Sequence, residues 1–291
     1  MSQPIALKDV FKSKPHHSSR SSKQYQNLIY KPDYIKPAAK TEILNYLATL
    51  YPIWEMRFSE SNPPPAGESN RELKRPVYWL GNWQFACLDY YHPPKGIRNR
   101  CVTAESYPPV LKKIITEIES EVRQTFSPKD VPEDWHLNTC LINFYGNKFY
   151  DDVAIDSARV GEHKDFEPGP VASVSFGEKA LFQFVKSEGK QQKSQVILQQ
   201  WLDDSSLQIF GGDKFKKQLF HRVQRVENKG IVFKDLKTMG FETRRINFTF
   251  RYVPREHVQP YRSFPENLRA DLKNYVTELA THSTYWKNEL I

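Results

Sequence analysis

A succession of short strand-like segments between about residues 137 and 252 constrains the fold more than any other feature of the sequence. In these segments apolar and polar residues alternate, and clusters of Gly, Asp, Asn and Lys separate them. The predicted strands are 137–144, 170–176, 180–185, 194–201, 206–210, 221–226 and 243–252. Closely spaced alternating strands favour a sandwich or barrel, and a jelly roll of two facing sheets is its natural closure.

Helical periodicity lies on both sides of this region. Apolar residues at three- and four-residue spacing predict helices over about 37–51 and 108–126, and a further helix after residue 263. The sequence therefore predicts an α+β protein. Its expected parts are an N-terminal region at 31–135 that contains the first two helices, a jelly-roll core at 136–255 and a C-terminal helical extension at 256–291.

The amino-terminal tail carries most of the positive charge. The net charge is +8, and residues 1–40 hold eight Lys or Arg against two Asp, which leaves +2 for the remainder. Residues 1–30 are poor in large apolar side chains, a composition typical of a disordered cationic tail. Such a tail attracts phosphates non-specifically, or serves only to keep the chain soluble.

No apolar run approaches the roughly 20 residues that cross a bilayer, and the first residues lack the apolar stretch of a signal peptide. We therefore expect no membrane association and an intracellular location, cytoplasmic or nuclear.

One set of residues has the pattern of a metal site. His163 and Asp165 are two residues apart in GEHKDFEPG, so in an extended chain both side chains point to the same face. His221 follows 58 residues later, at the start of another predicted strand. Two imidazoles and one carboxylate form the facial triad that holds non-haem Fe(II) and leaves coordination positions open for other ligands. A His-x-Asp pair taken alone is weak evidence.

The segment RINFTFR at 245–251 adds independent evidence. Strict alternation places Arg245, Asn247, Thr249 and Arg251 on one face of a strand and three apolar residues on the other. The polar face is directed either outward into water or into the interior of the barrel. Two buried guanidinium groups would require anionic partners, and a dicarboxylate such as 2-oxoglutarate supplies them.

With these motifs in order, the chain resembles the AlkB family of Fe(II)- and 2-oxoglutarate-dependent dioxygenases. Supporting matches are NFYG at 143–146, PVASVSFGEKALFQF at 170–184, GG at 211–212 and, more weakly, RPVYWLG at 75–81. The resemblance covers about residues 75–252, and GEHKDFE and PVASVSFG are most similar to the branch that repairs duplex DNA. It implies a double-stranded β-helix (jelly roll), Fe(II), 2-oxoglutarate and O2.

The resemblance also implies roles for individual residues. His163, Asp165 and His221 would hold the iron, and the cosubstrate ligands would be Asn143, Tyr145, Arg245, Asn247 and Arg251. Glu167 matches a position that contacts the substrate base, although it could equally be a solvated loop carboxylate. The family forms a nucleotide-recognition lid in the region that supplies the stacking candidates Trp83, Phe85, Tyr90 and Tyr91. The alternative for each of these four aromatics is a place in a core strand. Two departures are Phe166, where the duplex-repair branch has an acidic residue, and the long interval before His163, which predicts a hairpin or flap at 147–160.

The function implied by the resemblance is oxidative dealkylation of N-alkylated nucleic-acid bases, with alkylated DNA as the expected partner and DNA repair as the expected role. Three alternatives stay open. The chain could be an oxygenase of the same fold that acts on RNA, on protein or on a small molecule. It could also be a non-catalytic nucleic-acid-binding module, although an intact triad argues against this.

Overall fold

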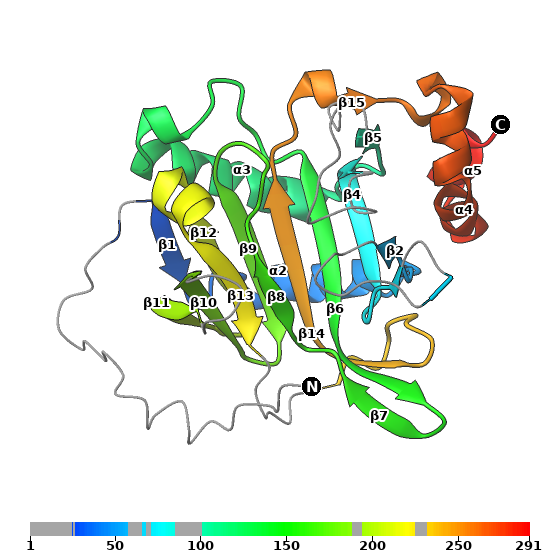
Figure 1. Ribbon diagram of the computed structural model, residues 1–291, viewed down its shortest axis with the longest axis horizontal. Coiled ribbons are helices and arrows are strands. Elements are labelled where there is room, and N and C mark those ends of the chain that lie inside the picture. The colour runs from blue at the N-terminus through cyan, green and yellow to red at the C-terminus, as the bar shows by residue number, and fades with distance from the viewer. Residues whose placement is uncertain are drawn as a thin grey trace.

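Two facing β-sheets form the centre of the fold in this computed structural model (Figure 1). The structure describes residues 25, 27–57, 66–67, 71–84, 101–187, 194–224 and 232–291. The larger sheet has the order β1-β12-β9-β14-β6-β4-β5-β15, with β7 paired to β6, and the smaller has the order β11-β10-β13-β8. This is an α+β protein with a jelly-roll core, as the sequence predicts.

The strands of the larger sheet, in chain order, are β1 Leu28–Lys31, β4 Val77–Gln84, β5 Cys101–Thr103, β6 Thr139–Tyr150, β7 Val153–Asp156, β9 Val171–Gly177, β12 Ser206–Phe210, β14 Phe241–Arg251 and β15 Val258–Gln259. Those of the smaller sheet are β8 Val160–His163, β10 Ala180–Lys186, β11 Gln195–Leu202 and β13 Phe220–Gln224. A separate hairpin pairs β2 Met56–Arg57 with β3 Arg71–Glu72.

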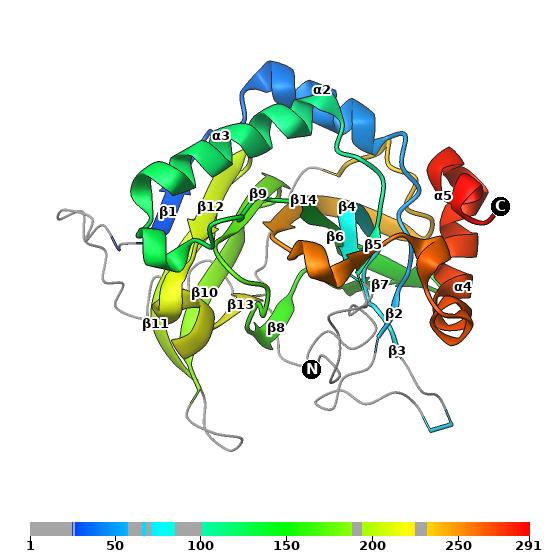
Figure 2. The same ribbon diagram turned by 90° about the horizontal axis from the view of Figure 1, so that it is seen from above.

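Two helices, α2 Pro37–Leu47 and α3 Pro109–Thr125, cover the outer face of the larger sheet, opposite the smaller sheet (Figure 2). Each begins with proline at its first turn, where the missing N–H costs no hydrogen bond. The buried residues of α3 recur at three- and four-residue spacing, namely Val110, Leu111, Ile114, Ile115, Ile118 and Val122. This apolar stripe binds the helix to the sheet.

The chain ends in two further helices, α4 Glu266–His282 and α5 Thr284–Glu289. Short helical turns lie at η3 Pro128–Asp130, η5 Arg255–His257 and η6 Tyr261–Ser263, and η4 Lys214–Gln218 is a π-helix. Of the helices in the described ranges, none is long and apolar enough to span a membrane.

Strand β14 contains the RINFTFR segment and lies between β9 and β6 in the larger sheet. Ile246, Phe248 and Phe250 are fully buried in the main core cluster. Arg245 and Arg251 alternate with them and are directed between the two sheets, each 3% exposed. Of the two orientations that the sequence allows, the structure therefore has the inward one.

The long interval before His163 forms a hairpin, as expected. Strands β6 and β7 pair with each other, with Asn147 opposite Asp156 at one end and Tyr150 opposite Val153 next to the turn. The two turn residues, Asp151 and Asp152, both have positive φ, 44° and 64°, as a two-residue turn of type I′ requires. The hairpin extends beyond the edges of the two sheets (Figure 1).

Helix and strand positions agree with the sequence predictions to within a few residues in most places. Among the elements that were predicted, the largest boundary differences are α2, which ends at Leu47 instead of near residue 51, and β6, which continues to Tyr150 instead of residue 144. The region before residue 136 also contains strands that the sequence analysis did not predict, among them β1, which pairs with β12, and β4, which pairs with β6.

Candidate functional site

A pocket opens between the two sheets, and its walls include residues from β6, β8, β13 and β14. The predicted metal ligands and the predicted cosubstrate ligands both line it. They come from separate segments of the chain, and the facing sheets bring them together.

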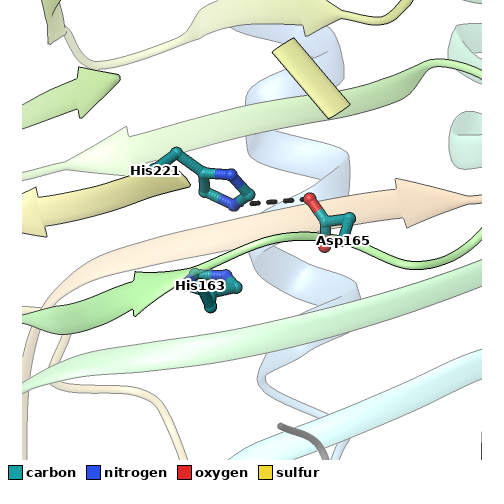
Figure 3. A group of neighbouring side chains, drawn as sticks. All are labelled: His163, Asp165 and His221. Atoms are coloured by element: carbon teal, nitrogen blue, oxygen red, sulfur yellow. Dashed lines mark ion pairs between the residues drawn. The ribbon is translucent and has the colours of Figure 1, made fainter. Parts of the chain in front are cut away.

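His163, Asp165 and His221 form a compact buried group (Figure 3). His163 at the end of β8 stands directly opposite His221 on β13, and their ring centroids are 4.2 Å apart. The Asp165 Oδ2 atom lies 3.3 Å from the Nε2 atom of His221. One possible ligand atom from each residue lies within 4.8 Å of the other two, so this group could hold a metal ion.

Hydrogen bonds and packing orient the two imidazoles. The Nδ1 atom of His163 donates to the carbonyl oxygen of Gly161 at 2.8 Å, which leaves Nε2 without the proton and free to bind a metal. The ring of Phe182 stacks on His221 with centroids 5.4 Å apart. This aromatic wall limits the rotation of the His221 ring.

The surroundings favour the protonation states that bind metal. Burial lowers the pKa of His163 and lowers that of His221 well below its usual value, an effect that the nearby Asp165 carboxylate opposes. Burial raises the pKa of Asp165, but Arg251 and His221 lower it more, and the net shift is downward. Neutral imidazoles and an ionised carboxylate are the forms that coordinate divalent metals.

Arg251 is paired with the protein itself. Its Nη2 and Nε atoms lie 2.7 and 2.8 Å from the Oδ1 atom of Asp165, and Nε lies 3.5 Å from a carboxylate oxygen of Glu167. Arg251 therefore fixes the orientation of the Asp165 carboxylate.

Arg245 has a different environment. Its Nη2 atom donates to the Ser175 hydroxyl at 3.1 Å, and its guanidinium lies 4.8 Å from the centroid of the Tyr145 ring. Burial lowers the pKa of Arg245, and the nearby Tyr145 and Glu178 oppose this shift. Its Nε and Nη1 atoms are buried, and no group in the described part of the chain accepts a hydrogen bond from either of them. A buried cation with two unsatisfied donors requires an anionic acceptor, and a carboxylate is such a group.

Asparagine side chains complete this part of the pocket. Asn247 donates to the Ser173 hydroxyl at 2.8 Å and to the carbonyl oxygen of Val174 at 3.1 Å. Asn143 accepts a hydrogen bond from Arg75 Nε at 2.9 Å, and the guanidinium of Arg75 lies 5.1 Å from the centroid of the Tyr145 ring. Arg75 and Arg245 therefore both contact Tyr145.

Arg75 is a pocket residue that the sequence reasoning did not identify. The available signal was the RPVYWLG segment, in which an arginine directly precedes a strand. That signal was weak because the strand's place beside Asn143 is set by long-range pairing of β4 with β6.

The proposed substrate residues do not share one location. Trp83 is 1% exposed and packs against Tyr275 and Trp286, with ring centroids 6.0 and 5.5 Å away, so it belongs to the core and does not line the pocket. Glu167 is 3% exposed and lies beside Arg251. Phe85, Tyr90 and Tyr91 lie outside the described residues.

A jelly roll with a buried His, Asp and His group between its sheets has the architecture of a metal-dependent oxygenase. The sequence profile of the 2OG-Fe(II) oxygenase superfamily matches residues 27–251, from the start of β1 to the end of β14. The match covers most of the chain, and the chain belongs to this superfamily. Its cofactor is Fe(II) and its cosubstrates are 2-oxoglutarate and O2.

Solved structures with a similar arrangement are distant in sequence. OsALKBH1 is 19% identical, with 78% of this chain and 98% of that chain covered and a TM-score of 0.46. The ribosomal oxygenase YcfD of Escherichia coli is 12% identical, with 86% and 52% covered and a TM-score of 0.34. IDO from Bacillus thuringiensis is 10% identical, with 78% and 91% covered and a TM-score of 0.35. A search of curated proteins found no match.

Proposed function

We propose that His163, Asp165 and His221 hold Fe(II). The proximity of the three ligand atoms within 4.8 Å carries this assignment. We further propose that Arg245 binds a carboxylate of 2-oxoglutarate, because its Nε and Nη1 donors have no hydrogen-bond partner in the described part of the chain. Asn143, Tyr145 and Asn247 would complete the cosubstrate site, and Arg251 would lie at its boundary with the metal site.

When bound, the iron supplies oxidation by O2, coupled to conversion of 2-oxoglutarate to succinate and CO2. The residues of the chain bind and orient the reactants. Arg245 would fix the cosubstrate, Arg251 would keep Asp165 oriented and ionised, and the apolar wall of Phe182 would limit access of water.

The proposed reaction is oxidative dealkylation of an N-alkylated nucleic-acid base. Hydroxylation of the alkyl carbon gives a hemiaminal, which breaks its carbon–nitrogen bond to release an aldehyde and the repaired base. The similarity of GEHKDFE and PVASVSFG to the duplex-repair branch of the AlkB family supports alkylated DNA as the substrate.

The charge of the pocket also supports an anionic substrate. Three lining residues are cationic, Arg75, Arg245 and Arg251, and Asp165 is the carboxylate among the residues known to line it. The +2 charge of Fe(II) and the −2 charge of 2-oxoglutarate cancel. The three arginines and the one carboxylate therefore leave the loaded pocket with a formal charge of 3 − 1 = +2 when both histidines are neutral. Such a field attracts polyanions. The modified base would have to leave the helical stack, or be single-stranded, to reach the iron.

A substrate screen tests the proposal directly. The protein with Fe(II), 2-oxoglutarate and O2 is incubated with N-methylated single-stranded DNA, duplex DNA, RNA, a peptide mixture and free methylated nucleosides, and succinate and formaldehyde are measured. Both products should form in equal amounts with DNA, and the Asp165→Ala variant should form neither. Equal turnover of free nucleosides and DNA would contradict the proposal that the substrate is a nucleic acid. Products formed from RNA alone or from peptides alone would favour those substrates instead.

A further inference from the structure

A second pocket lies apart from the one that holds the proposed metal site. It has a volume of about 480 Å³, within the range of small-molecule sites, and its walls come from α2, β4, the segment between β5 and α3, and helices α4 and α5. Helices α4 and α5 lie on the opposite side of the molecule from β1 (Figure 1). No described residue lines both pockets, so the second pocket is a separate site.

The second pocket is acidic, although the chain as a whole has a net charge of +8. Glu105 and Glu278 line it, and none of the described residues in its walls is a Lys or Arg. Neither carboxylate forms an ion pair with any residue that the structure describes. The Oε1 atom of Glu105 accepts hydrogen bonds from the hydroxyls of Tyr78, at 3.1 Å, and Ser283, which are neutral donors. The pocket therefore has two negative charges without a counter-charge from the described part of the chain.

The surroundings of Glu278 add to the negative field. Partial burial raises the pKa of Glu278, and the nearby carboxylates of Glu55 and Glu72 raise it further. Both effects disfavour the ionised carboxylate, and a cation placed beside it would oppose them.

Aromatic rings form much of the wall. The tyrosines that line the pocket are Tyr46, Tyr51, Tyr78 and Tyr285. The hydroxyl of Tyr285 donates to the carbonyl oxygen of Thr103 at 2.9 Å, and His282 stacks on Tyr51 with ring centroids 3.6 Å apart. The ammonium of Lys237 lies 4.1 Å from the centroid of the Tyr51 ring, so one of these rings already contacts a cation of the chain. Tyrosine rings attract ammonium and guanidinium groups and pack against the alkyl chains that bear them.

We propose that the second pocket binds a small organic cation, an alkylammonium or alkylguanidinium group, with Glu105 and Glu278 as its counter-charges and the tyrosine rings around its apolar part. A free amine and the side chain of Lys or Arg in a peptide share this chemistry. The same carboxylates repel nucleic acid, so this ligand differs from the proposed substrate. The site is independent of the proposed oxygenase reaction, and either proposal can fail without the other.

Calorimetric titration of the full chain with three probes of equal length tests the charge requirement. The probes are hexamethylenediamine, the corresponding terminal amino alcohol and the terminal diol, with two, one and no positive charges. The affinity should decrease from the diamine to the amino alcohol, and the diol should not bind. A lysine blocked by acetyl and methylamide groups represents a peptide side chain. Tighter binding of the blocked lysine than of the diamine would identify a peptide as the source of the cation, and the reverse order would identify a free amine.

Three variants place the binding in this pocket. Glu105→Gln should weaken diamine binding by about tenfold or more, because it removes a hydrogen bond between charged groups. Glu278→Gln should weaken it by about two- to fivefold, because this carboxylate is more exposed. Ser106→Trp places a large neutral ring at an exposed position of the wall and should block the pocket. The matched control is Glu133→Gln, which removes an exposed carboxylate outside the pocket and should bind as the wild type does.

Thermal unfolding shows whether each variant folds. Should Glu105→Gln fail to fold, because Tyr78 and Ser283 both donate to Glu105, then Glu278→Gln and Ser106→Trp decide the outcome. Equal affinity for the diamine and the diol would show that the pocket does not recognise charge. Binding that persists in Ser106→Trp, or that decreases equally in Glu133→Gln, would place the cation elsewhere on the protein. A wild-type protein that binds none of the probes would also overturn the proposal.

Discussion

Arg251 directs two nitrogen atoms at a single carboxylate oxygen of Asp165, Nη2 at 2.7 Å and Nε at 2.8 Å. The pair is almost completely buried, and loss of one partner would leave an uncompensated charge. The aspartate of the proposed triad is therefore held in place by the same strand that contains Arg245.

Replacement of Arg251 by Lys should weaken binding of divalent metal by about 10- to 100-fold, because a single ammonium cannot reproduce the two-nitrogen contact. Calorimetric titration with Mn(II) measures the change. Arg222→Lys is the matched control, since Arg222 is next to His221 but pairs with Glu162 outside the pocket. An equal loss in both variants would contradict the proposed role of Arg251.

Arg245 should affect the cosubstrate and not the metal. Arg245→Gln should weaken binding of 2-oxoglutarate to the Mn(II)-loaded protein by about 1.5–3 kcal/mol, or roughly 10- to 150-fold, the usual value of hydrogen bonds to a charged group. The Kd for Mn(II) should stay within about threefold of wild type. Ser175→Ala removes a hydroxyl that accepts from Arg245 and from Asn247 but leaves the guanidinium in place, so its effect should be smaller. An unchanged Kd for 2-oxoglutarate in Arg245→Gln would refute the assignment.

The stability of the metal-free protein should depend on pH through its two buried histidines. Their pKa values are lowered in the folded chain, so protons bind the unfolded chain more strongly. This contribution to stability is complete above the unfolded pKa near 6.5 and is lost as the pH falls below it. The Tm should therefore be constant between about pH 7 and 8 and should decrease below about pH 6.5.

The double variant His163→Gln, His221→Gln provides the comparison, because its side chains do not titrate. Its Tm should change less than that of the wild type between about pH 6.5 and 5.5. The lowered pKa of Asp165 adds a separate loss of stability at more acidic pH, below about 3.9. Identical pH profiles for wild type and variant would show that other groups cause the decrease.

The sequence predicted some parts of this site well because they depend on local geometry. Strand alternation alone separates Arg245 and Arg251 from Phe248, and the two-residue spacing of His163 and Asp165 places them on one face. The inward direction of Arg245 and Arg251 needed one further argument, that two buried cations require an anionic partner. The structure agrees with the inward direction.

Other parts depend on contacts between distant segments, which periodicity does not contain. The pairing of Arg251 with Asp165 joins residues that are 86 positions apart. Strand β4 was missed because Val77, Tyr78, Trp79 and Leu80 are buried on both faces of the strand and so show no alternation. Trp83 was a candidate for a substrate lid because of its aromatic ring, but the same property suits a core strand, and in the structure it packs next to Trp286.

The amino-terminal tail should contribute to nucleic-acid binding but not to chemistry. A deletion should stop at residue 24, because β1 at Leu28–Lys31 pairs with β12 in the larger sheet. Residues 1–24 contain five Lys or Arg and one Asp. Their removal should weaken oligonucleotide binding at low salt, while turnover of a saturating short oligonucleotide should persist. Loss of turnover in that assay would show that the tail supports the active site.

Arg75 should contact a phosphate of the substrate, because it lines the pocket and has no carboxylate partner among the described residues. Each phosphate contact contributes about 0.7 for single strands or 0.9 for duplex DNA to the slope of log Kd against log salt concentration. Arg75→Gln should reduce the slope by about this amount, whereas Lys129→Gln, which neutralises an exposed lysine outside the pocket, should change it less. Turnover of a methylated nucleoside, which has no phosphate, should be the same in wild type and Arg75→Gln. A higher KM for 2-oxoglutarate with an unchanged salt slope would instead assign Arg75 to the cosubstrate, through its contacts with Asn143 and Tyr145.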